Sequence, residues 1–159
     1  MKPKHLLVKV TKDKNGKYSA EEKIRVHEEF LLKSDYSYWG SNHNLRAETI
    51  NLMIDEDKNM KLKTYVLILF SNKEKTTDDY FEFKAELLSA RRDKRTNKEI
   101  LTHLPPLFRC NDHELWLKIK NIKKVSNNTD YLLNNYRTLR KRSLKKINMC
   151  SMARIKKVI

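Results

Sequence analysis

The side chains that most often carry out catalysis are scattered along this chain. Its five histidines, His5, His27, His43, His103 and His113, share no spacing with a cysteine or a carboxylate partner. The sequence contains no nucleophile elbow, no glycine-rich phosphate loop and no HExxH zinc motif, and its two glycines are too few for a backbone phosphate cradle. We therefore expect no catalytic residues, no metal and no cofactor.

A group of acidic residues between positions 78 and 86 is the strongest candidate for a catalytic metal site. Asp78, Asp79, Glu82 and Glu86 are of the type that holds Mg²⁺ in nucleases. The simpler interpretation is a solvated turn followed by the outward face of a strand. A small metal-dependent nuclease or toxin stays open as the alternative to a non-catalytic protein.

Aromatic rings gather in one short segment that is also rich in turn-forming polar residues. Tyr36, Tyr38 and Trp39 lie within four positions, and serines and Asn42 surround them. Aromatic clusters in such segments are typical of a pocket or a stacking surface. Alternatively, Trp39 fills the core beside a central strand, and the residues alone leave both interpretations open.

The charge balance indicates a polyanionic partner. The chain has 159 residues, 35 Lys and Arg against 20 Asp and Glu, a formal net charge of +15 and a pI of about 9.8. DNA or RNA is the usual partner of such a protein, and an anionic membrane surface is the weaker alternative. A structural ribonucleoprotein that reads only phosphate is a third possibility. The candidate phosphate-binding residues are Arg91, Arg92, Arg95, Arg137, Arg140, Lys141, Arg142, Lys145 and Lys146.

Nothing in the sequence predicts secretion or membrane insertion. Neither of the two cysteines, Cys110 and Cys150, lies in a CxxC pair, and the apolar run at 6–10 is too short for a signal peptide. No apolar stretch approaches the length that spans a membrane. We expect a cytoplasmic protein without a membrane partner.

Hydrophobic periodicity predicts the elements that position these residues. Apolar or alternating runs predict strands over 5–10, 23–33, 64–71, 80–88 and 114–125. The run at 64–71 is apolar on both faces, so we expect a central strand with Leu67 and Leu69 buried. A short helix is predicted over 45–54, capped by Asn44, and a basic helix over 130–147.

The order of several short motifs resembles a known family. Phe30-Leu31-Leu32-Lys33-Ser34 followed by Tyr38-Trp39-Gly40-Ser41-Asn42 resembles the opening of a YTH domain. The next landmarks of that family are an apolar strand ending in Phe-Ser, as at 66–71, and a closing strand with a Trp, as at 115–119. The landmarks agree in order over residues 26–125.

The resemblance implies a PUA-like mixed β-barrel that holds a modified base in an aromatic pocket. YTH domains bind N6-methyladenine in RNA, and similar domains on the DNA-binding subunit of McrBC-type restriction systems bind a flipped modified base. Trp39 matches a wall of the pocket, and Leu107 and Phe108 are available for a second wall. The full set of pocket residues is then Lys33, Ser34, Asp35, Tyr36, Tyr38, Trp39, Ser41, Asn42, Leu107 and Phe108.

The combined prediction is an α+β protein with two parts. Residues 1–125 form a YTH/EVE-like barrel with flanking helices, and residues 126–159 form a basic helical extension. The predicted function is non-catalytic recognition of a modified base, N6-methyladenine, in DNA or RNA. A partner protein or a fused effector subunit would use this recognition in the native context.

Overall fold

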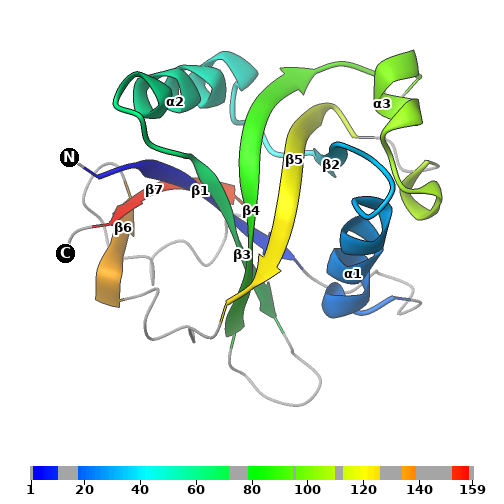
Figure 1. Ribbon diagram of the computed structural model, residues 1–159, viewed down its shortest axis with the longest axis horizontal. Coiled ribbons are helices and arrows are strands. Elements are labelled where there is room, and N and C mark those ends of the chain that lie inside the picture. Colours follow the sequence, from blue (N-terminus) through cyan, green and yellow to red (C-terminus); the bar gives the residue numbers. More distant parts are fainter. Residues whose placement is uncertain are drawn as a thin grey trace.

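A seven-stranded mixed sheet organises the chain. The computed structural model describes residues 2–10, 18–71, 79–94, 96–109, 113–125, 134–138 and 152–157. The strand order is β2-β5-β4-β3-β1-β7-β6, in which β1 and β3 are parallel and the other neighbours are antiparallel (Figure 1). The strands are β1 (Lys4–Val10), β2 (Ser37–Ser41), β3 (Tyr65–Ser71), β4 (Asp79–Arg92), β5 (Leu115–Lys124), β6 (Tyr136–Thr138) and β7 (Met152–Lys157).

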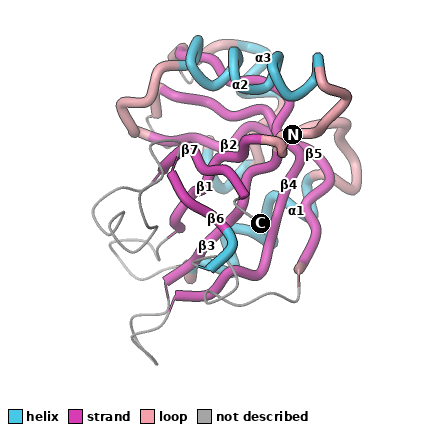
Figure 2. The backbone as a smooth tube through the Cα atoms, turned by 90° about the vertical axis from the view of Figure 1, so that its left-hand side faces the viewer, coloured by secondary structure: helices cyan, strands magenta, loops and turns pink. Residues whose placement is uncertain are grey.

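Helices pack on both faces of this sheet. They are α1 (Ala20–Phe30), α2 (Ala47–Asn59), α3 (Lys98–Thr102) and the 3-10 helix η1 (Pro106–Phe108). Ile24 of α1 and Ile50 of α2 join the main core on one face, whereas Ile100 of α3 packs on the other face. In both views α2 and α3 lie at the same end of the molecule (Figure 2). None of the helices in the described ranges is long and apolar enough to cross a membrane.

The strands predicted at 5–10, 64–71 and 114–125 are confirmed as β1, β3 and β5. Leu67 is buried as expected, and the side chain of Leu69 lies outside the described part. The strand predicted at 80–88 extends to Arg92. Arg91 and Arg92, two of the candidate phosphate-binding residues, are therefore the last residues of a strand.

The strand predicted at 23–33 is wrong, because this segment forms the helix α1. Ser19 caps the helix, and its Oγ accepts a hydrogen bond from the backbone N–H of Glu22. Ser19 and Glu22 have the spacing of a capping box, which marks the start of a helix. Ile24 and His27 are buried at helical spacing, so the alternation of Ile24 and Val26 was misleading.

The helix predicted at 45–54 is confirmed but begins and ends later, as α2. Arg46 rather than Asn44 occupies the cap position. The side chain of Asn51 on α2 exchanges two hydrogen bonds of 2.8 Å with the backbone of Ala90. This amide pairs with β4 beyond the end of β3, so α2 supports the part of β4 that carries Arg91 and Arg92.

Within the predicted basic helix, residues 134 and 135 are helical, and the chain departs from the prediction after them. Residues 136–138 form β6 and residues 152–157 form β7, which pairs with β1. The remainder of the predicted helix lies outside the described residues. Strands β6 and β7 thus belong to the same sheet as the strands before residue 125.

The sheet is open in the described part of the chain. β2 and β6 are its two edge strands, and no pairing between them closes it. The α+β class is confirmed, and the closed barrel is not.

Candidate nucleic-acid interface

Trp39, the predicted pocket wall, points into the main core. Its side chain is 8% exposed, and its ring stacks on the imidazole of His27 with centroids 4.8 Å apart. The other side of that imidazole stacks on Phe108, also at 4.8 Å. His27 therefore fills the space between two rings that the sequence predicted as walls of a pocket.

His27 is held in this position as a neutral ring. Its Nδ1 lies 2.8 Å from the Oγ of Ser37, and burial lowers the pKa of His27 to about 3. The imidazole is consequently uncharged near neutral pH. A base could enter between Trp39 and Phe108 only after α1 had withdrawn this ring.

Tyr36 and Tyr38 lie on the opposite face of β2 from Trp39. Both hydroxyls donate hydrogen bonds of 3.0 Å to Oε1 of Glu99, and the Arg91 guanidinium donates to Oε2 of Glu99 at 2.9 Å. The ring of Tyr36 stacks on His103 at 3.9 Å. Burial and the bond to Glu99 raise the pKa of Tyr38 to about 12. This network attaches α3 to the edge of the sheet, and the predicted aromatic group is divided between two faces.

The other predicted pocket residues do not converge on Trp39. Lys33 and Asp35 are exposed, and Leu107 is half-buried in η1. The hydroxyl of Ser34 donates to the carbonyl of Tyr36, and the hydroxyl of Ser41 accepts from the backbone of His43. These two serines stabilise the turns on either side of β2.

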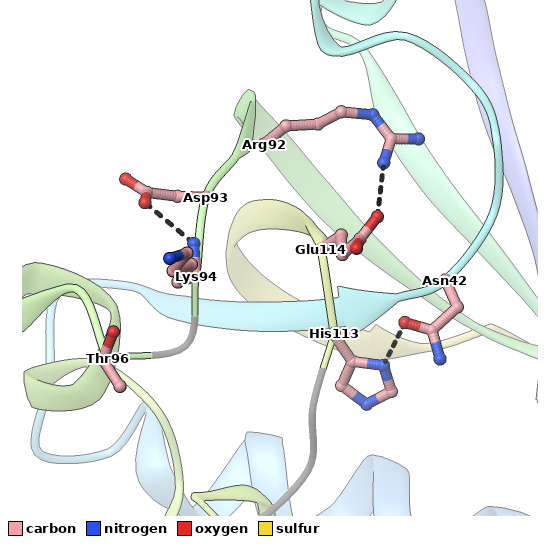
Figure 3. Close-up of a pocket in the computed structure, with 7 residues that line it drawn as sticks. All are labelled: Asn42, Arg92, Asp93, Lys94, Thr96, His113 and Glu114. Atoms are coloured by element: carbon pink, nitrogen blue, oxygen red, sulfur yellow. Dashed lines mark hydrogen bonds and ion pairs between the residues drawn. The ribbon is translucent and has the colours of Figure 1, made fainter.

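A hollow opens at the end of the sheet where β2 and β4 finish and β5 begins (Figure 3). Its volume is about 850 Å³. It brings together Asn42, predicted for the base pocket, and Arg92, predicted for phosphate binding. The described residues that line the hollow are Asn42, Arg92, Asp93, Lys94, Thr96, His113 and Glu114.

Hydrogen bonds fix the position of Arg92 at the rim of this hollow. Its Nη2 donates to the backbone carbonyls of His43 and Leu45 at 2.6 and 3.1 Å. Its Nη1 lies 3.8 Å from the carboxylate of Glu114. This guanidinium thus braces the β2–α2 loop, which holds Asn42 beside the ends of β4 and β5.

Lysines gather on the face of β4 and β5 that is turned away from α1 and α2. Lys84 lies between core residues Phe83 and Ala85, and Lys118 lies between core residues Leu117 and Ile119. Because strand side chains alternate, both lysines point to the opposite face. We call this surface the lysine face; its members are Lys63, Lys84, Lys118, Lys120 and Lys123.

The lysine face combines positive charge with aromatic rings. Lys84 and Lys123 are direct register partners, which places like charges opposite one another. The ammonium of Lys84 lies 4.7 Å above the ring of Tyr65, and that of Lys118 lies 3.9 Å above Tyr36. The alternation at 114–125 could have revealed Lys118 and Lys120, but their grouping with Lys84 depends on strand register.

The predicted phosphate-binding residues have other roles where they are described. Arg91 forms ion pairs with Asp93 at 2.7 Å and with Glu99 at 2.9 Å. Arg137 donates to the carbonyl of Tyr136 within β6. The remaining predicted residues, Arg95, Arg140, Lys141, Arg142, Lys145 and Lys146, lie outside the described part.

The structure describes only some of the acidic residues that would form the site of a metal-dependent nuclease. Asp78 and the side chains of Asp79 and Glu82 lie outside the described part. Glu86 is on the lysine face, where its carboxylate accepts from Asn121 and lies 3.8 Å from Lys63. No group of three His, Cys, Asp or Glu residues suited to a metal occurs among the residues that the structure describes.

Comparisons with protein-family models, with curated proteins and with solved structures found no match for this chain.

Proposed function

We propose that this protein binds nucleic acid without catalysing a reaction, and that the lysine face contacts the phosphate backbone. The direct pairing of Lys84 with Lys123 carries this proposal. Like charges at opposing positions of a sheet destabilise the fold, and a bound polyanion would remove that cost. Lysines that neutralise phosphates also release counterions, which favours binding at low salt.

The arrangement of the strands suits a backbone contact. Lys118 and Lys120 project from the same side of β5, and Lys84 and Lys123 continue the row across the β4–β5 pair. Tyr36 and Tyr65 lie beneath two of these ammonium groups, so aromatic rings lie next to the charges. Positive charge interleaved with aromatic rings is typical of surfaces that bind single strands.

The resemblance to YTH domains extends this proposed function to the recognition of a modified base, N6-methyladenine. We extend the same proposal to a PUA-like architecture, for which the mixed sheet flanked by helices is the supporting feature. Because His27 fills the space between Trp39 and Phe108, a base cannot use that space in the described conformation. Base recognition therefore needs either a withdrawn α1 or a different site.

A titration of the purified protein against labelled oligonucleotides tests this function. The probes are single-stranded DNA, duplex DNA and RNA of one sequence, each with and without N6-methyladenine, in the presence of Mg²⁺. We expect binding that weakens steeply as salt rises, intact probes and tighter binding of the methylated strand. Failure to bind any probe at low salt would contradict nucleic-acid binding. Cleavage of the probes would favour the metal-dependent nuclease. Equal affinity for methylated and unmethylated probes would contradict recognition of a modified base.

A further inference from the structure

Resting on the proposed nucleic-acid binding, we propose that the hollow formed by Asn42, Arg92, Asp93, Lys94, Thr96, His113 and Glu114 binds one unpaired nucleobase of the bound strand. The hollow lies where β4 ends and β5 begins, and the lysine face lies on the same two strands. A strand whose phosphates follow the lysine face could therefore place a base at this end of the sheet.

The charge of the hollow favours a base over a phosphate. Among the lining residues that the structure describes, the cationic Arg92 and Lys94 are matched by two carboxylates, Asp93 and Glu114. Asp93 remains ionised because the backbone N–H of Lys94 and the Arg91 guanidinium lower its pKa. Arg92 is already bonded to two backbone carbonyls. A phosphate would meet these carboxylates, whereas a neutral base with donors and acceptors on its edge would not be repelled.

Asn42 is suited to read such an edge. Its side chain is exposed at the mouth of the hollow, and its Oδ1 lies 3.3 Å from Nδ1 of His113 (Figure 3). An asparagine amide offers a donor and an acceptor side by side in one plane. In duplex recognition this geometry matches the N6 and N7 atoms of adenine. The hollow is therefore expected to prefer adenine.

His113 supplies a planar ring beside this amide. The imidazole packs edge-on against Trp116, with centroids 5.7 Å apart and planes 83° apart. Gly40 lies beneath the two rings, and a Cβ at this position would lie within 2.9 Å of Trp116 and would also overlap His113. The absence of a side chain at Gly40 thus allows His113 to settle at the hollow, where a base can stack on it.

The size of the hollow sets a condition on the partner. A volume of about 850 Å³ is in the range of small-molecule sites and can take one nucleotide unit. Extruding a base from a duplex costs a few kcal/mol, and an unpaired base avoids this cost. A single strand, or a site with an already unpaired adenine, should consequently bind better than a regular duplex.

Two matched probes separate the base from its phosphates. One is an abasic strand that carries a single central adenine, and the other is the same strand without adenine. We expect wild-type protein to bind the adenine probe about tenfold more tightly. Asn42→Ala and His113→Gln should each remove this preference without changing affinity for the abasic probe. The control is Asn44→Ala, an exposed asparagine outside the hollow, and it should retain the preference.

Each other outcome has a distinct meaning. Equal binding of both probes by wild-type protein would overturn the base site while leaving phosphate binding intact. Equal loss of affinity for both probes in Asn42→Ala would show that the hollow contacts phosphate, which would also overturn it. Wild-type protein that binds neither probe would show that the proposed function itself is wrong. Circular dichroism of each variant establishes that the fold is retained.

Discussion

Two buried histidines connect single residues to the stability of the fold. Nδ1 of His5 accepts a hydrogen bond of 3.0 Å from the backbone N–H of Tyr65, so this nitrogen must be unprotonated in the folded protein. Burial lowers the pKa of His5 to about 4, although Asp57 opposes the shift. His27 is held neutral in the same way between Trp39 and Phe108. Both residues favour the fold only in the uncharged form.

We predict that stability declines as pH falls below about 6.5, the ordinary histidine pKa. Between pH 6.5 and the folded value of about 4, the unfolded chain binds a proton at His5 that the folded chain does not. Asn presents an acceptor near the position of Nδ1 but does not titrate. The free energy lost by wild-type protein between pH 7 and pH 4.5 should exceed that lost by His5→Asn by about 2 kcal/mol. Urea unfolding at the two pH values measures this difference, and equal losses would contradict the assignment.

At the scale of elements, the pairing of β2 with β5 brings together the residues at the ends of these strands that line the hollow, such as Asn42 and His113. Gly40 pairs with Trp116, and Tyr38 donates its backbone N–H to the carbonyl of His103 on the free edge of β2. The strand is therefore fixed on both sides. Its single glycine is required by the rings of Trp116 and His113, which leave no room for a side chain.

We predict that Gly40→Ala destabilises the protein by about 1–3 kcal/mol, because the added methyl group overpacks the contact with Trp116 and His113. Ser41→Ala, the adjacent position, is the control and should cost less than half as much. Thermal and urea unfolding of the two variants provide the comparison. Wild-type stability in Gly40→Ala would show that the rings do not pack on this glycine.

The elements also show which parts of the structure can be read from the sequence. Strands β3 and β5 were predictable because their apolar periodicity reflects burial within the sheet. Helix α1 was missed because Ile24 and Val26 alternate, although Ser19 and Glu22 have the spacing of a capping box. The hollow could not be predicted, because Asn42, Arg92 and His113 meet only through the neighbour order β2-β5-β4.

At the scale of the whole molecule, the charge is distributed unevenly over the sheet. The main core and the helices α1 and α2 occupy one face, and the other face carries the lysine face together with α3 and its smaller apolar cluster. The net charge of +15 predicted a polyanionic partner, but only strand register shows that Lys84 and Lys123 are adjacent. The central claim is that this surface, rather than positive charge in general, binds the phosphate backbone.

The salt dependence of binding to a single-stranded oligonucleotide tests this claim most directly. Lys118→Gln/Lys120→Gln removes two charges from the lysine face. The control Lys58→Gln/Lys156→Gln removes two exposed charges outside the lysine face. Lys58 is on α2, and Lys156 is on β7, on the face of the sheet opposite the lysine face. We predict that the slope of log affinity against log salt flattens by roughly 1.4 in the first variant, which corresponds to two lost phosphate contacts, and stays near wild type in the second. Equal slopes in the two variants would contradict the assignment of the lysine face.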